Sequence, residues 1–79
     1  MNDKAKLILS DLKERYGKAS LSKYELANEL GVSRSTIDLY MSRGYGIPNY
    51  KKLGTSRNAK VIFNIVDVAE FLADTIKTA

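Results

Sequence analysis

Apolar residues recur along the chain at spacings that predict four helices and one pair of strands. The first helix is expected over residues 3 to 16, with a polar cap at residue 2 or 3 and a stop at Gly17. Its apolar positions lie three or four residues apart, as one helix face requires: Ala5, Ile8, Leu12 and Tyr16. Leu7 and Leu9 fall off that face, so an exposed apolar surface is expected beside it.

Two further helices are expected close together in the middle of the chain. A capping box that begins at Ser22 predicts a helix over residues 23 to 30. A second serine cap predicts another helix over residues 34 to 43, only three residues later. Helices joined by so short a connection must cross steeply, and Ile37 is placed to fill the angle between them. The spacing therefore predicts a helix-turn-helix over residues 22 to 43.

The last third of the chain predicts a hairpin and a final helix. Residues 49 to 53 and 60 to 63 are expected to form two short strands, separated by a Gly-Thr-Ser-Arg-Asn loop at residues 54 to 58. Asn64 can cap a helix over residues 64 to 77. Its apolar stripe is Ile65, Val68, Ala69, Leu72 and Ile76, widened by Val66 and Phe71. The expected fold is mainly α with a small β-hairpin, in one domain over residues 1 to 79.

Two residue types that usually carry chemistry are missing. The chain contains no cysteine and no histidine, so disulfides, thiolate metal sites and the commonest general base are excluded. Glu25 and Glu29 lie one helical turn apart, but without further clustered carboxylates they are interpreted as a solvated helix face. We therefore expect no catalytic residues, no metal site and no cofactor.

The hydrophobic runs are too short for a membrane segment. The longest near the N-terminus is Leu7-Ile8-Leu9, which is shorter than a signal-peptide core and far shorter than a membrane span. A cytoplasmic protein without a membrane partner is expected.

Positive charge is concentrated in the second third of the chain. Six basic residues and one acidic residue lie between positions 34 and 60, whereas the rest of the chain has seven basic and eight acidic residues. The net charge of +4 therefore arises entirely from this segment. A basic segment that spans a helix-turn-helix and a hairpin is typical of nucleic-acid binding.

Three stretches of the sequence resemble the winged helix-turn-helix domains of the excisionase-like, AlpA-like and MerR-like group. They are LSKYELANELGVSRSTIDLY from residue 21, GIPNYKKLG from residue 46 and KVIFNIVDVAEFL from residue 60. The resemblance covers residues 21 to 72, and residues 1 to 17 look like an extension private to this chain. It implies that the hairpin is a wing and that the helix over residues 34 to 43 is a recognition helix. Members of the group act as excisionases, as prophage or plasmid transcription regulators and as DNA-recognition parts of small terminase subunits.

The helix-turn-helix and its wing provide the candidate DNA contacts. On the second helix and its cap they are Ser33, Arg34, Ser35, Asp38 and Arg43. On the hairpin they are Lys51, Lys52, Arg57, Asn58 and Lys60, which suit phosphates or the minor groove. Tyr40 is expected to pack in the core, whereas packing and DNA contact remain equally open for Tyr45 and Tyr50.

The function expected from these features is sequence-specific binding of double-stranded DNA, as a transcription regulator or excisionase of a phage or mobile element. Further expected partners are a second copy of the chain bound cooperatively on DNA, and an integrase or another phage protein. Two alternatives remain open. One is an adaptor that acts through protein contacts, which the off-face leucines of the first helix favour. The other is the DNA-recognition part of a packaging complex.

Overall fold

The computed structural model describes residues 1–56 and 58–74, and within these ranges it contains four helices and a small three-stranded antiparallel sheet. The elements are α1 (Asp3–Tyr16), β1 (Ser20–Leu21), α2 (Lys23–Leu30), α3 (Arg34–Arg43), β2 (Lys51–Leu53), β3 (Lys60–Asn64) and α4 (Ile65–Ala73). The mainly helical fold with a β-hairpin is thus confirmed, and it is compatible with a helix-turn-helix followed by a wing. None of the described helices has the length and apolarity needed to cross a membrane.

The helices begin where polar side chains cap them. The Asn2 side chain accepts a hydrogen bond from the Ala5 amide at 2.7 Å and begins α1. At Ser22 both halves of the predicted capping box are present, and Ser33 caps α3 through the Thr36 amide. Gly31 ends α2 with a φ of +69°, a left-handed conformation that a side chain would strain. Caps and turn residues therefore fix the three-residue connection between α2 and α3.

The sheet contains one strand that the sequence analysis missed. β2 and β3 form the predicted antiparallel hairpin, with Lys52 opposite Val61. On the other edge of β3, the two-residue strand β1 pairs Leu21 with Phe63, and the Ile65 amide extends the pairing to the Ala19 carbonyl. Two residues are too few to show an alternating pattern. β1 exists because pairing with β3, about forty residues later, satisfies its backbone groups.

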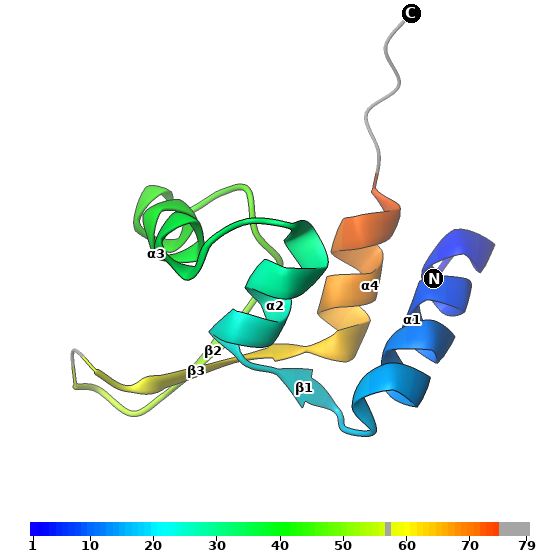
Figure 1. Cartoon of the computed structure of the whole chain (residues 1–79), viewed down its shortest axis with the longest axis horizontal. Coiled ribbons are helices and arrows are strands. Elements are labelled where there is room, and N and C mark those ends of the chain that lie inside the picture. The colour runs from blue at the N-terminus through cyan, green and yellow to red at the C-terminus, as the bar shows by residue number, and fades with distance from the viewer. Residues whose placement is uncertain (57, 75–79) are drawn as a thin grey trace, which may run out of the picture.

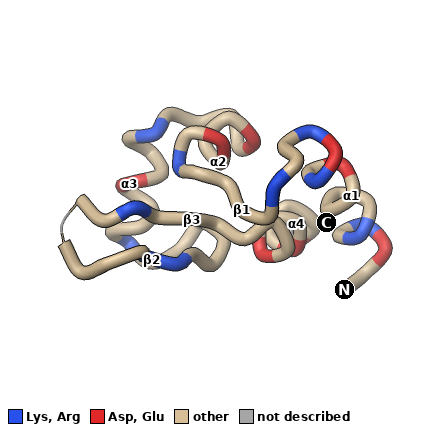
Figure 2. The backbone as a smooth tube through the Cα atoms, turned by 90° about the horizontal axis from the view of Figure 1, so that it is seen from below, with Lys and Arg blue, Asp and Glu red and all other residues tan. Residues whose placement is uncertain are grey.

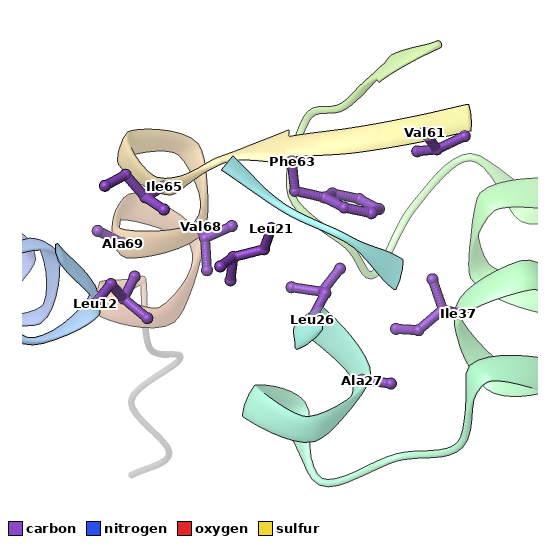
Figure 3. Close-up of a cluster of buried hydrophobic side chains, with 10 residues drawn as sticks. All are labelled: Leu12, Leu21, Leu26, Ala27, Ile37, Val61, Phe63, Ile65, Val68 and Ala69. Atoms are coloured by element: carbon purple, nitrogen blue, oxygen red, sulfur yellow. The ribbon is translucent and has the colours of Figure 1, made fainter. Parts of the chain in front are cut away.

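The core runs along the whole molecule and joins α1 to the remaining elements. At one end Phe63, Leu26 and Ile37 meet between β3, α2 and α3, as Figure 3 shows. At the other end Leu12 of α1 packs with Val68 and with the rest of the same cluster. α1 and α4 lie side by side in Figure 1 and make extensive contact. The first helix is therefore an integral part of the core rather than an appendage.

Two details of the predicted apolar faces and one helix bound are wrong. Leu9 packs against the core cluster, so of the two off-face leucines in α1 only Leu7 is exposed. Val66 is exposed and does not widen the stripe of α4. The last helix also ends at Ala73 rather than at residue 77.

The end of α4 has a local cause. Asp74 adopts an extended conformation while its amide still bonds back to the carbonyls of Glu70 and Phe71. Aspartate is a poor helix residue, and its carboxylate is unfavourable at the negative end of the helix dipole. Ile76, which was expected on the apolar stripe, lies outside the described residues.

Glu25 and Glu29 have structural roles, so the interpretation as a solvated helix face is wrong. Glu29 accepts hydrogen bonds from the Arg15 guanidinium and from the Tyr16 hydroxyl, and its side chain is only 10% exposed. Bonding to Arg15 lowers the pKa of Glu29 despite its partial burial. Glu25 completes the cap of α2 and pairs with Lys18, which lowers its pKa as well. Glu29 therefore holds α2 against α1, and Glu25 holds α2 against the loop that follows α1.

Replacing Glu29 with glutamine should destabilise the protein in a pH-dependent way. Because the folded protein lowers the pKa of Glu29, its stabilising contribution is present at neutral pH and is lost as the pH falls through the carboxylate range. We expect Glu29→Gln to lower the free energy of unfolding by about 1 to 2 kcal/mol at neutral pH. The difference from the wild type should shrink at about pH 3.

Urea unfolding at both pH values measures this effect. Glu14→Gln changes an exposed carboxylate of α1, the helix that carries Arg15 and Tyr16, and serves as the matched control. A loss of stability from Glu29→Gln that is equal at both pH values would show that the charge of Glu29 is not what stabilises the contact.

Candidate nucleic-acid interface

One side of α3 is turned away from the core. Ile37 is fully buried and fixes the rotation of the helix about its axis. Residues on the other sides of the helix are therefore directed outward, because positions three or four apart share a face. The exposed side chains are Arg34, Ser35, Asp38, Leu39, Ser42 and Arg43. Ser33 is exposed too, but its hydroxyl caps the Thr36 amide and contacts the Thr36 hydroxyl.

The first turn of α2 holds Arg34 in place. The Arg34 guanidinium lies over the Tyr24 ring, 4.6 Å from its centroid, and Arg34 Nη1 donates a hydrogen bond to the Tyr24 hydroxyl at 2.7 Å. Both side chains are exposed to solvent. The contact therefore orients an arginine at the surface, where a ligand can reach it.

The next turn of α3 is held by the neighbouring residue of α2. Lys23 Nζ lies 2.7 Å from a carboxylate oxygen of Asp38. Asp38 is half exposed, whereas Lys23 is largely covered. The pairing neutralises the one carboxylate on the outward side of α3 and so reduces the repulsion that an approaching phosphate would meet.

The lysines of the hairpin lie on both faces of its two strands. Residues directly opposite each other in an antiparallel pair point to the same face. Lys52 therefore shares the face of buried Val61, while Lys51 and Lys60 share the opposite face. All three lysines are exposed. The predicted contact residue Arg57 lies outside the described residues.

A cleft of about 460 Å³ lies where α2, α3 and the end of the hairpin meet. Of the predicted contact residues it brings together Arg34, Asp38, Asn58 and Lys60. The other residues that line it are Ser22, Lys23, Tyr24, Ala59 and Val61. Lys23 and Tyr24 were missed by the sequence analysis. Their position in the first turn of α2 was the available signal, because in a tight helix-turn-helix that turn lies close to α3.

The tyrosines differ in how far they are buried. Tyr40 was expected in the core, but it is only half-buried and does not belong to the core cluster. Its ring lies against Gly46, where a Cβ atom would come within 3.5 Å of it, and the Arg43 guanidinium lies 5.8 Å from the ring centroid. The Tyr50 ring contacts Phe63 and is partly exposed. Tyr45 is largely exposed. Arg43 is the last residue of α3 and Tyr45 follows the helix; neither lines the cleft.

Charge is distributed unevenly between the two halves of the molecule. In Figure 2 the strands β2 and β3 carry basic residues without an acidic one, whereas all four helices carry acidic residues, α3 only Asp38. The ion pairs of α1 and α2 further neutralise the half that contains α1. Cations, hydroxyl groups, one amide and the carboxylate of Asp38, which is paired with Lys23, thus line a cleft beside an exposed helix face. The excess of cations over carboxylates suits a polyanionic ligand. Comparisons of the chain with models of protein families, with curated proteins and with solved structures find no match.

Proposed function

We propose that the protein binds double-stranded DNA as a winged helix-turn-helix, with α3 in the major groove and the β2–β3 hairpin as the wing. One observation carries the proposal: the outward side of α3 and the basic end of the hairpin flank the same cleft. Groove contacts and backbone contacts would then be made side by side. Specific DNA recognition needs both kinds, because base edges specify the sequence and phosphates fix the position.

α3 has the dimensions and side chains for reading bases. With its side chains an α-helix is about 10 to 12 Å wide, close to the width of the major groove. Arg34 is the candidate for a bidentate contact to a guanine, and Ser35 for a hydrogen bond to either partner of a base pair. Leu39 is 48% exposed on the same side. An apolar side chain there suits the methyl group of thymine.

The hairpin supplies the backbone contacts. Lys51, Lys52 and Lys60 are exposed and have no ion-pair partner within the described part of the chain. They can replace the counterions condensed on DNA phosphates, and Asn58 at the edge of the cleft can donate to a phosphate oxygen. Arg57 belongs to this group by its position in the sequence. In this arrangement the hairpin clamps the strand next to the groove occupied by α3.

The biological role follows from the resemblance of the sequence to excisionase-like and regulator domains. We infer a DNA-binding protein of a phage or mobile element, which occludes or bends its site and catalyses no reaction. The adaptor alternative loses support because Leu9 packs against the core, and a single exposed Leu7 is not an apolar patch.

Alanine variants of Arg34 and Lys60 should affect binding in different ways. On a duplex enriched from a randomised pool by the wild-type protein, Arg34→Ala should lose about 1 to 3 kcal/mol of binding free energy, with much less lost on a mixed-sequence duplex. Lys60→Ala should weaken binding to both duplexes alike. It should also make the negative slope of log affinity against log salt shallower by about 0.9, because one counterion fewer is released.

Fluorescence anisotropy with both duplexes across a salt series measures these effects. Lys13→Ala removes an exposed lysine from α1, distant from the cleft, and should change neither affinity nor slope. Equal losses on the two duplexes would make Arg34 a backbone contact. If neither Arg34→Ala nor Lys60→Ala changes affinity, the proposed interface is wrong.

A further inference from the structure

Arg34 and Asp38 would be expected to pair with each other, yet each contacts α2 instead. They lie four residues apart on α3, the spacing at which opposite charges on a helix surface attract. Arg34 bonds to Tyr24 and Asp38 pairs with Lys23. Two consecutive residues in the first turn of α2 thus determine where the outward polar groups of α3 are held.

The partner of Arg34 is neutral, which preserves the positive charge of the guanidinium. Within residues 1–56 and 58–74 no carboxylate forms an ion pair with Arg34. A carboxylate in place of Tyr24 would cancel that charge and repel phosphates. The Tyr24 hydroxyl accepts a hydrogen bond from Nη1 only, while the ring attracts the guanidinium through its π face.

The geometry leaves part of the guanidinium available for a ligand. Arginine presents five N–H donors in a planar fork, and the contact with Tyr24 uses a donor on Nη1. The remaining donors include the Nε and Nη2 pair, which can bind two acceptors at once. Fixing the guanidinium before binding removes rotamer freedom that would otherwise be lost in the complex.

We propose that Tyr24 is a specificity-determining positioning residue, which holds the Arg34 guanidinium for a bidentate contact to a guanine base. The inference rests on the proposed DNA binding and adds a residue outside α3 to the reading of sequence. Tyr24 acts through Arg34, so its effect must disappear when Arg34 is absent. If Tyr24 simply contacted a phosphate, its removal would weaken binding to every duplex, and the loss would be the same with and without Arg34.

A double-mutant cycle tests this dependence. The readout is the ratio of affinities for the enriched and mixed-sequence duplexes, measured for Tyr24→Ala, Arg34→Ala and the double variant. Tyr24→Ala should lower the ratio about two- to fivefold, the factor expected from an exposed cation–π contact. Tyr24→Phe retains the ring, so its affinity ratio should lie between those of the wild type and Tyr24→Ala. In the Arg34→Ala background, Tyr24→Ala should have no further effect.

Tyr45→Ala is the matched control, because Tyr45 and Tyr24 are both 66% exposed and Tyr45 does not line the cleft. It should show no coupling to Arg34→Ala. Additive effects of Tyr24→Ala and Arg34→Ala, or equal losses on both duplexes, would overturn the positioning role while leaving DNA binding intact. Absence of any binding by the wild type would overturn the proposed function and this inference together.

A second measurement needs no DNA. In the NMR spectrum of the free wild-type protein, the Arg34 side-chain protons should be shifted upfield by the ring current of Tyr24. The shift should persist in Tyr24→Phe and vanish in Tyr24→Ala. The backbone amide resonances of the rest of the protein should stay largely unchanged, because Tyr24 is exposed. Unshifted Arg34 protons in the wild type would show that the guanidinium is not held, and would contradict the proposal.

Discussion

Ile37→Asp should unfold the protein at ordinary temperatures. Ile37 is fully buried between α2, α3 and β3, next to Leu26 and Phe63. The residues around this side chain offer no partner for a carboxylate, because every member of the buried cluster is apolar. Placing an unpaired charge there should cost several kcal/mol. The total stability of a chain of this length is only about 4 to 12 kcal/mol.

Leu39→Asp is the matched control for that substitution. It makes the same kind of change two residues later on α3, where the side chain is 48% exposed, and should alter stability by about 0.5 kcal/mol or less. Thermal unfolding followed by circular dichroism distinguishes the two variants. A cooperative transition of Ile37→Asp close to that of the wild type would mean that α3 is rotated differently about its axis.

Leu12→Ala should be nearly as damaging, although it lies far from the proposed interface. Leu12 is 0% exposed and belongs to the same cluster as Val68 and Leu21. Removing three carbon atoms from such a site should lower the free energy of unfolding by about 2 to 5 kcal/mol. For a domain of this size that corresponds to a fall of at least about 8 °C in Tm.

Leu7→Ala removes the same atoms from the same helix at a position that is 74% exposed, and should change stability by about 0.5 kcal/mol or less. Chemical denaturation of both variants decides whether α1 is part of the core. If Leu12→Ala is as stable as Leu7→Ala, α1 is an appendage, as the resemblance of residues 21 to 72 alone would suggest.

The helices could be predicted from the sequence because their determinants are local. A capping serine acts within three residues, and Gly31 ends α2 through its own backbone conformation. The approximate bounds predicted for α1, α2 and α3 accordingly agree with the observed ones. β1 could not be predicted, because its two residues form a strand only by pairing with Phe63 and Asn64. The role of α1 in the core likewise depends on contacts with α4, distant in sequence.

The candidate site was predicted less completely than the fold, because side-chain partners are tertiary features. The sequence placed Arg34 and Asp38 on the outward side of α3, and both are exposed there. It did not predict that Tyr24 and Lys23 hold them, since the crossing angle of α2 and α3 determines those contacts. Glu29 was misread for the same reason: its partners Arg15 and Tyr16 belong to another helix.

The salt dependence of binding to a mixed-sequence duplex tests the proposed function most directly. Lys51, Lys52 and Lys60 are the exposed lysines of the hairpin that we assign to the DNA backbone. If about three phosphates are neutralised, log affinity should fall against log salt with a slope of about −2.7. A slope near this value that becomes shallower in Lys60→Ala, and stays unchanged in Lys13→Ala, is the predicted result. No detectable binding at about 0.05 M salt, or an affinity independent of salt, would contradict the assignment of this face to DNA.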